Sequence, residues 1–134
     1  MAYWLVKTEP ETYSWEKFTQ LGRDHWDGVR NFQARNNLRL MKVGDEVLFY
    51  HSGSEKSVVG IAKVVREYYP DPTIDDDRWV VVDMVPLRSL MRPITLAEIK
   101  QDPQLNGLPL IKNTRLSVMP VLREHFDAIL SKGE

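Results

Sequence analysis

The sequence predicts an α+β domain, a small mixed β-barrel flanked by short helices. Five short runs rich in β-branched and aromatic residues are separated by turn-forming Gly, Pro, Asn and Asp. Short segments with helical apolar spacing lie between these runs, and no internal repeat interrupts them. A length of 134 residues, with 43% hydrophobic and 28% charged residues, is typical of one globular domain. Residues 1–134 are therefore predicted to form a single domain.

A strand and a short helix are predicted near the N-terminus. Residues 3–8 (YWLVKT) are aromatic and β-branched, and Pro10 ends the run. Since this strand is apolar on both faces, we expect it at the centre of the sheet or in the barrel wall. Ser14 is a suitable N-cap for a helix through Leu21, with apolar side chains at helical spacing (Trp15, Phe18 and Leu21).

A second helix and a second strand follow. Residues 31–41 predict a helix with a narrow apolar stripe (Ala34, Leu38 and Met41). The Val-Gly-Asp turn at 43–45 leads into a strand over residues 46–51 (EVLFYH).

Two longer strands are predicted in the middle of the chain. A hairpin-type loop at 52–56 precedes a strand over 57–69, in which Gly60 indicates a bulge or a close approach. An acidic loop at 70–78, interrupted by Pro, leads into a strand over 79–87 (WVVVDMVPL).

The C-terminal third is predicted to hold a helix, a strand and a closing helix. Thr95 and Glu98 form the pattern of a capping box. Residues 115–121 (RLSVMPV) predict the fifth strand, which Pro120 places at an edge of the sheet. The last helix follows from apolar residues at i, i+4, i+7 and i+8 (Leu122, Phe126, Ile129 and Leu130).

Composition excludes several classes of protein. A net charge of −1 argues against a non-specific, salt-bridging nucleic-acid binder, so any phosphate contact has to come from a local basic patch. The absence of Cys excludes disulfides, thiolate metal sites and Cys nucleophiles, and it fits a reducing, cytoplasmic location. We expect neither a signal peptide nor a membrane span, because no basic leader or long apolar run is present.

The sequence does not indicate a catalytic or metal site. His25, His51 and His125 are far apart, with no closely spaced ligand pair, so we expect no metal and no cofactor. There is no Gly-x-Ser-x-Gly elbow and no Gly-rich phosphate loop. The chain is therefore predicted not to be an enzyme.

The most informative segment is 26–37 (WDGVRNFQARNN), which combines an indole, guanidiniums and amides with almost no acid. A core segment would need a partner for each of these polar groups, and a surface helix would interleave acids with its bases. The mixture suits a polyanionic ligand with planar parts, because guanidiniums bind phosphates, amides bind base edges and an indole stacks. The predicted phosphate contacts are Arg30, Arg35, Arg39 and Lys42.

Other side chains have two interpretations. Trp26 either covers an edge of the core or forms a stacking wall, and its context supports both about equally. Lys7 is either a strand-end lysine or a cation at a pocket rim. Arg115 and Ser117 alternate with apolar residues, so they either bind an anion from one strand face or pair with the acidic loop. A polar cluster ends the 46–51 strand, either as a pocket mouth or as an ordinary strand end (Tyr50, His51 and Ser52).

Four blocks of the chain resemble the EVE domain, a member of the PUA-like superfamily together with the YTH and ASCH domains. They are residues 3–10 (YWLVKTEP), 26–37, 43–52 with its VGD and FYHS segments, and 115–121. The resemblance covers essentially the whole chain and implies a PUA-like β-barrel with helices around it.

The resemblance also implies a function. EVE domains resemble readers of modified bases, whose pocket accepts a flipped nucleotide such as a methylated or hydroxymethylated cytosine in DNA, or a modified base in RNA. We expect His51 or Ser117 to be the buried partner that reads a polar modification. The ligand-binding residues implied in this way are Lys7, Trp26, Val29, Asn31, Tyr50, His51, Ser52, Arg115 and Ser117.

The leading hypothesis is a monomeric, non-enzymatic module that binds a modified base in DNA or RNA. A binder of a free nucleoside or nucleotide is the alternative, which the modest net charge permits, and an enzyme acting on a base is third. An open pocket beside a positive surface favours the first, whereas an enclosed cavity in neutral surroundings favours the second.

Overall fold

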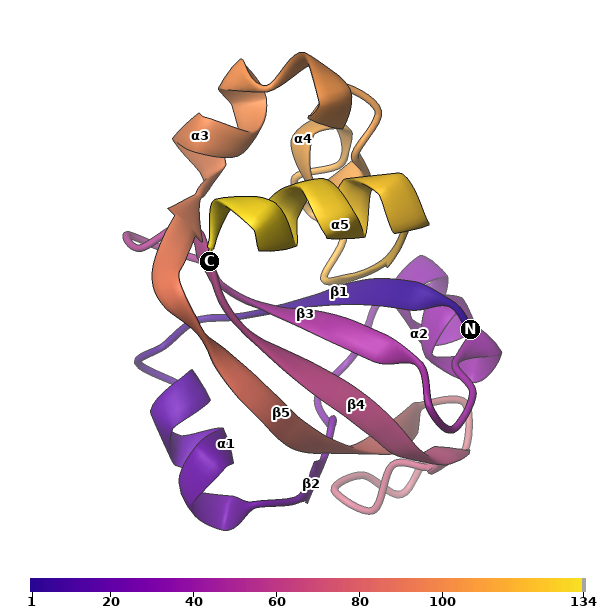
Figure 1. Cartoon of the computed structure of the whole chain (residues 1–134). Coiled ribbons are helices and arrows are strands. Elements are labelled where there is room, and N and C mark those ends of the chain that lie inside the picture. The colour runs from indigo at the N-terminus through magenta and orange to yellow at the C-terminus, as the bar shows by residue number, and fades with distance from the viewer. Residues whose placement is uncertain (134) are drawn as a thin grey trace.

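The computed structural model describes residues 1–133 and shows a strongly curved six-stranded sheet with helices around it (Figure 1). The strand order is β2-β5-β4-β3-β1-β6, in which β1 and β3 run parallel and the other neighbours antiparallel. The strands are β1 (Tyr3–Thr8), β2 (Asp24–His25), β3 (Glu46–His51), β4 (Ser57–Pro70), β5 (Val80–Thr95) and β6 (Val118–Val121). As predicted, β1 is an inner strand and β6, with Pro120, is an edge strand.

Side-chain caps begin three of the helices, and the caps at Ser14 and Thr95 are the predicted ones. Ser14 accepts a hydrogen bond from the Lys17 N–H, and Asn31 accepts one from the Ala34 N–H. Thr95 and Glu98 form the predicted capping box. The helices are α1 (Trp15–Leu21), α2 (Phe32–Leu40), α3 (Leu96–Gln101), α4 (Pro109–Lys112) and α5 (Arg123–Lys132), with a 3-10 turn at Pro103–Leu105.

Helix α2 closes the curved sheet into a barrel-like shape. It packs against β6 at one end of the strand order and against β5 and β4 toward the other. Its apolar stripe is fully buried, as predicted (Ala34, Leu38 and Met41). The α+β class with a mixed barrel and short flanking helices is therefore confirmed.

The structure differs from the prediction in its shortest and least regular elements. Strand β2 was not predicted, because two residues carry no periodicity of their own and become a strand only by pairing with β5. Strand β5 continues past residue 87, where the predicted strand ends, to Thr95, since register shifts against β4 accommodate its irregular sequence. Strand β6 begins at Val118, so the predicted strand over 115–121 is three residues too long.

Gly60 marks both a bulge and a close approach, as predicted. The register between β4 and β5 shifts between Val58 and Gly60. A Cβ atom on Gly60 would lie 2.3 Å from Cζ2 of Trp15, whose indole packs edge-on against Phe49 with ring centroids 5.0 Å apart. The indole of α1 can therefore lie against β4 only because residue 60 has no side chain.

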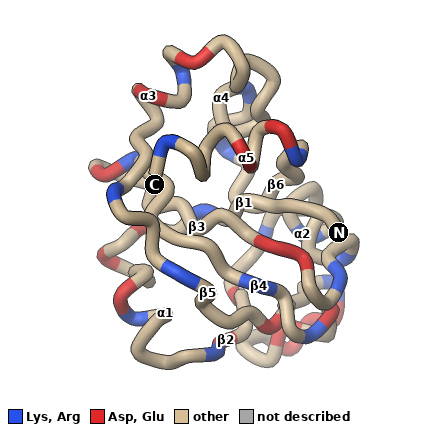
Figure 2. The backbone as a smooth tube through the Cα atoms, viewed as in Figure 1, with Lys and Arg blue, Asp and Glu red and all other residues tan. Residues whose placement is uncertain are grey.

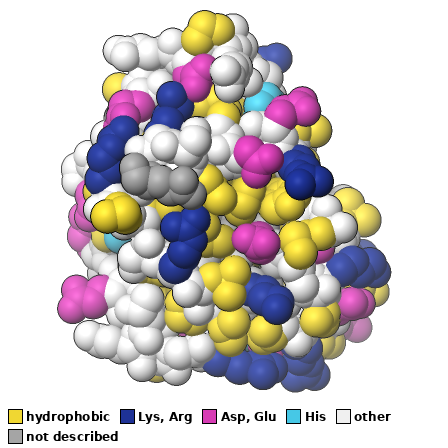
Figure 3. All heavy atoms as spheres, viewed as in Figure 1, with side chains coloured by type: hydrophobic (Ala, Val, Ile, Leu, Met, Phe, Trp, Pro, Cys, Tyr) yellow, Lys and Arg dark blue, Asp and Glu magenta, His cyan; other side chains and the backbone are white. Residues whose placement is uncertain are grey.

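Charged residues of both signs are distributed over the molecule. Figure 2 shows Lys and Arg as well as Asp and Glu spread over the whole tube, and Figure 3 shows the two signs interspersed on one face. The β4–β5 loop carries three consecutive carboxylates (Asp75, Asp76 and Asp77). No helix within residues 1–133 is long and apolar enough to cross a bilayer.

Candidate functional site

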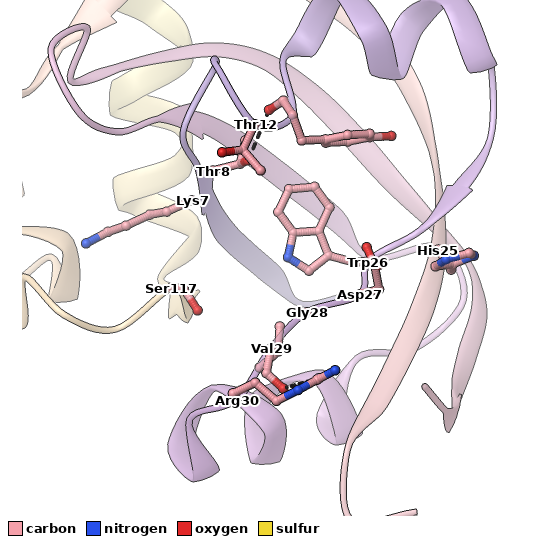
Figure 4. Close-up of a pocket in the computed structure, with 11 residues that line it drawn as sticks. Lys7, Thr8, Thr12, His25, Trp26, Asp27, Gly28, Val29, Arg30 and Ser117 are labelled. Carbon is pink, nitrogen blue, oxygen red and sulfur yellow. Dashed lines mark hydrogen bonds between the residues drawn. The ribbon is translucent and has the colours of Figure 1, made fainter. Parts of the chain in front are cut away.

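A cavity of about 480 Å³ opens beside the indole of Trp26 (Figure 4). Such a volume lies within the range of small-ligand sites. Strand β1, the loop that precedes α1, the segment from β2 to Arg30 and the residue before β6 form its walls. The lining residues are Lys7, Thr8, Thr12, Tyr13, His25, Trp26, Asp27, Gly28, Val29, Arg30 and Ser117.

Two aromatic rings form a corner of this pocket. The rings of Tyr13 and Trp26 are nearly perpendicular, with centroids 6.0 Å apart. On its other side Trp26 contacts Phe49 edge-on at 5.5 Å, and it is only 8% exposed. Trp26 therefore covers the core and also lines the pocket, which combines the two interpretations of this residue.

The hydroxyl groups near the aromatic corner have internal partners. The Tyr13 hydroxyl donates to Asp24 at 2.7 Å, and the Thr8 hydroxyl donates to the Tyr13 carbonyl at 3.0 Å. Burial, reinforced by the hydrogen bond to Asp24, raises the pKa of Tyr13 far above its ordinary value. The phenol consequently stays neutral, and these bonds fix the orientation of its ring.

Lys7 is the cation at the other side of the pocket. Its ammonium group points away from the indole (Figure 4) and donates to the Thr114 carbonyl at 3.0 Å. Burial lowers the pKa of Lys7 from its ordinary value. Lys7 also lines a second pocket, of about 310 Å³, so it forms the partition between the two.

Asp71 anchors the pocket segment to the β4–β5 loop. Its fully buried carboxylate accepts hydrogen bonds from the Gly28 N–H at 3.2 Å and from Arg30 Nη1 at 3.0 Å. Gly28 has a φ of 79°, a left-handed conformation that favours glycine. Burial by itself would raise the pKa of Asp71, but hydrogen bonds from Thr73, Arg30 and Gly28 lower it to about 2.

We expect Asp71→Asn to lower the free energy of unfolding by about 2 kcal/mol, because hydrogen bonds to a charged group contribute roughly 1.5–3 kcal/mol. The folded-state pKa lies below the ordinary value of 3.8, so the stabilisation is complete above about pH 4 and is lost as the pH falls toward 2. Urea unfolding across this window is expected to show a shallower acid loss for Asp71→Asn than for the wild type. Asp77→Asn, in the same loop but exposed, is the control. Equal stability and equal acid profiles for the two variants would contradict the anchoring role.

The predicted site residues fall into three groups. Lys7, Trp26, Val29 and Ser117 line the pocket together with Arg30, which was expected to contact phosphate. Tyr50 and Ser52 line the second pocket instead. Asn31, His51 and Arg115 line neither of the two.

His51 is turned inward, away from the position expected of a ligand-reading group. Its Nε2 accepts a hydrogen bond from the Trp15 N–H at 2.9 Å, and its Nδ1 lies 2.9 Å from Glu55 Oε1. Because Nε2 is an acceptor here, the ring proton sits on Nδ1 and points at the carboxylate. Both ring nitrogens therefore hold the start of α1 against the β3–β4 loop. Of the two residues expected to read a polar modification, His51 and Ser117, only Ser117 lines the pocket.

Asn31 and Arg115 have local positions that explain their absence from the pocket. The Asn31 side chain is used as the N-cap of α2. Arg115 is exposed in the turn that precedes β6, so the expected alternation with Ser117 on one strand face does not occur. Ser117 still reaches the pocket, because its carbonyl accepts a hydrogen bond from the Lys7 N–H at 2.9 Å.

The other predicted phosphate contacts have intramolecular partners on and around α2. Arg35 donates to Asn36 and lies over the Phe32 ring at 5.0 Å. Arg39 lies over the Tyr68 ring at 5.4 Å. The Lys42 ammonium is 3.8 Å from Glu67.

The sequence prediction missed several lining residues, most importantly Tyr13 and Asp27. Asp27 is the one acidic residue of the segment 26–37 and was not among the predicted ligand-binding residues. Tyr13 lies in a loop without periodicity, and only its position next to the 3–10 block could have indicated a role. The other lining residues missed are Thr8, Thr12, His25 and Gly28.

Together, the barrel-like mixed sheet, the helix that closes it and the pocket beside Trp26 define a small domain of the PUA-like class. The family model of the EVE domain matches residues 2–132 of this chain, so the chain belongs to the EVE domain family. Mouse thymocyte nuclear protein 1 is 39% identical over 98% of this chain and 74% of its own length.

Solved structures of similar proteins have the same fold. The crystal structure of a protein from Agrobacterium tumefaciens is 40% identical, with a TM-score of 0.97 over 99% of this chain and 93% of that one. Human THYN1 protein, crystallised in complex with DNA containing 5-methylcytosine, is 35% identical, with a TM-score of 0.93 over 100% of this chain and 98% of that one.

Proposed function

We propose that this chain is a non-catalytic reader of a 5-substituted cytosine in DNA, which it binds by taking the flipped base into the pocket beside Trp26. The observation that carries the proposal is the set of groups in one open pocket: an aromatic corner, an apolar side chain and a carboxylate. The complex of the similar human THYN1 protein with DNA containing 5-methylcytosine supports the choice of ligand.

Stacking and flipping nearly balance in such a pocket. Extrusion of a base from a duplex costs a few kcal/mol, and least when the strand is already single. Stacking on an aromatic side chain returns about 1–3 kcal/mol. Contacts to the base edge and to the phosphates therefore have to supply most of the net affinity.

The edge of a cytosine matches the polar groups of the pocket. Cytosine presents an exocyclic N4 amino donor, which carboxylates accept. Asp27 lies beside Trp26 in the lining and provides that acceptor (Figure 4). Val29, which is 5% exposed, provides an apolar surface for a 5-methyl group.

The groups of the pocket suit binding rather than catalysis. A nucleophile needs an adjacent base that takes its proton. The Thr8 hydroxyl donates to a carbonyl instead, and the raised pKa of Tyr13 keeps its phenol protonated. The Tyr13 hydroxyl donates to Asp24, which lies outside the lining and holds the phenol in place.

The proposal is tested by titrating the protein with oligonucleotides of one sequence that carry cytosine, 5-methylcytosine or 5-hydroxymethylcytosine, as DNA and as RNA. We expect about a fourfold preference for 5-methylcytosine over cytosine, since burial of one methyl group contributes about 0.8 kcal/mol. Free nucleosides are added as competitors. Binding of free nucleosides without binding of oligonucleotides would favour the small-molecule alternative, and equal affinity for modified and unmodified strands would refute the proposal.

A single substitution tests the reading of the base edge. We expect Asp27→Ala to remove about 1–3 kcal/mol of the discrimination between 5-methylcytosine and 5-methyluracil, because the N4 donor loses its acceptor. Loss of a negative charge also strengthens binding to any polyanion, so Asp77→Ala, which makes the same change in an exposed loop, is the control. An unchanged ratio of the two affinities in Asp27→Ala would exclude this residue as the reader.

A further inference from the structure

A second pocket adjoins the base pocket across Lys7. It has a volume of about 310 Å³ and lies between the β3–β4 loop, the start of α3 and the turn at Thr114. Its lining residues are Lys7, Tyr50, Ser52, Gly53, Lys56, Leu96, Lys100, Leu110 and Thr114. A third depression, of about 380 Å³, shares Lys56, Leu96 and Lys100 with it. The three concavities thus form a row, with a lysine at each junction.

The second pocket is positively charged. Three of its lining residues are lysines and none is acidic. Within residues 1–133, Lys56 and Lys100 form no ion pair, and the hydroxyls of Ser52 and Thr114 also line the wall. Glu55, which directly precedes Lys56 in the chain, has its carboxylate 2.9 Å from Nδ1 of His51. The second pocket therefore presents lysine ammonium groups with no acidic residue in its own lining, and Glu55 lines only the adjoining third depression.

The backbone holds Lys56 in this position. Lys56 is the one residue other than glycine, within residues 1–133, with a positive φ (45°), a conformation that costs free energy for a side chain. Its carbonyl accepts a hydrogen bond from the Leu96 N–H at 2.8 Å, which fastens the loop to the start of α3. Figure 1 shows the β3–β4 loop beside the base of α3. The two lysines are consequently presented from neighbouring segments.

The basic residues on α2 and just after it contrast with this arrangement. Lys42 is paired with Glu67, Arg39 lies over Tyr68, and Arg35 donates to the Arg78 carbonyl at 3.3 Å. That last contact brings α2 next to the acidic β4–β5 loop, which repels phosphates. A polyanion that leaves the base pocket meets free cations on the side of Lys7 and compensated charges on the side of α2.

We infer that the phosphodiester backbone of the bound strand leaves the base pocket past Lys7 and lies in the groove between the β3–β4 loop and α3, where Lys56 and Lys100 bind its phosphates. The inference rests on the proposed function, because the strand enters this groove from the pocket that holds the flipped base. This groove, rather than α2, is then the phosphate-binding element, and it holds the backbone of a nucleic acid.

The test compares two double variants that remove the same charge, Lys56→Gln with Lys100→Gln, and Arg39→Gln with Lys42→Gln. For duplex DNA each lost phosphate contact lowers the slope of log affinity against log salt by about 0.9, so the groove variant is expected to lose about 1.8 units of slope. When the salt is raised from about 50 to 200 mM, the factor by which affinity drops is then roughly tenfold smaller for the groove variant than for the wild type. The α2 variant is expected to keep the wild-type slope, and both keep the ratio of modified to unmodified affinity.

A neutral linkage locates the contact. A methylphosphonate placed on either side of the modified cytosine removes one backbone charge, and we expect one of the two positions to weaken the wild type but not the groove variant. A wild-type slope in the groove variant, or a reduced slope in the α2 variant, would overturn the inference while leaving the base reader intact. A wild type that binds no oligonucleotide would overturn both.

Discussion

Replacement of Trp26 by alanine is expected to abolish the preference for a modified cytosine. The indole is the largest flat surface in the pocket, and stacking on it contributes about 1–3 kcal/mol only when a base is inserted. Phosphate contacts remain in the variant, so we expect it to bind modified and unmodified strands equally and weakly. Titration of both strands at one salt concentration measures the ratio.

The same substitution also removes part of the core, and the experiment has to separate the two effects. Trp26 packs edge-on against Phe49 at 5.5 Å, and truncation of a buried aromatic residue costs roughly 3–5 kcal/mol of stability. Trp4→Ala is the matched control, since Trp4 is also buried, at 5% exposed, and lies outside the pocket lining. Trp26→Phe is the milder variant, which keeps an aromatic ring. A folded Trp26→Ala protein with the wild-type affinity ratio would show that the pocket does not stack a base.

Gly60→Ala is expected to lower the free energy of unfolding by about 3 kcal/mol, near the upper end for an overpacked core. The added Cβ would lie 2.3 Å from Cζ2 and 2.6 Å from Cη2 of Trp15, so the indole or strand β4 has to move. Trp15 is wedged between Phe18 and Phe49, with ring centroids at 5.7 and 5.0 Å, so it has little freedom to shift. Urea denaturation of the purified variant measures the loss.

Two further variants make this prediction specific. Gly107→Ala is the control, because a Cβ there would meet its nearest neighbour, His125, at an ordinary 3.6 Å. Trp15→Phe removes the ring atoms that clash, so Gly60→Ala is expected to be much less harmful in that background than in the wild type. If the penalties in the two backgrounds simply add, steric conflict with the indole is not the cause.

Local features of the sequence were sufficient to predict most of the secondary structure. The predicted caps at Ser14 and Thr95 are correct because a cap depends on residues only three positions away. Gly60 could be identified because glycine within an apolar strand indicates a bulge or a close contact. Strand β2 could not be predicted, because its two residues form a strand only through pairing with β5.

The candidate site was predicted less completely than the fold. Trp26, Val29, Lys7 and Ser117 could be proposed because they lie in the blocks that resemble the EVE family, and all four line one pocket. His51 belongs to the same blocks but is turned inward by Trp15 and Glu55.

The order of the amino acids alone was enough to assign a mixed α+β fold of the EVE family and to pick out the unusual segment of indole, amide and guanidinium groups after residue 25. Hydrophobic periodicity, helix capping and the backbone freedom of glycine depend on residues that are close together in the sequence, so the sequence is enough to predict their effects. The three-dimensional packing was needed to show that Tyr13 lies against Trp26, that Asp71 anchors Gly28, and that lysines without an ion pair gather beside Lys7 rather than on α2. These contacts join residues up to 107 positions apart, as between Lys7 and Thr114, and such pairs are set by how the strands curve and pack rather than by local preference.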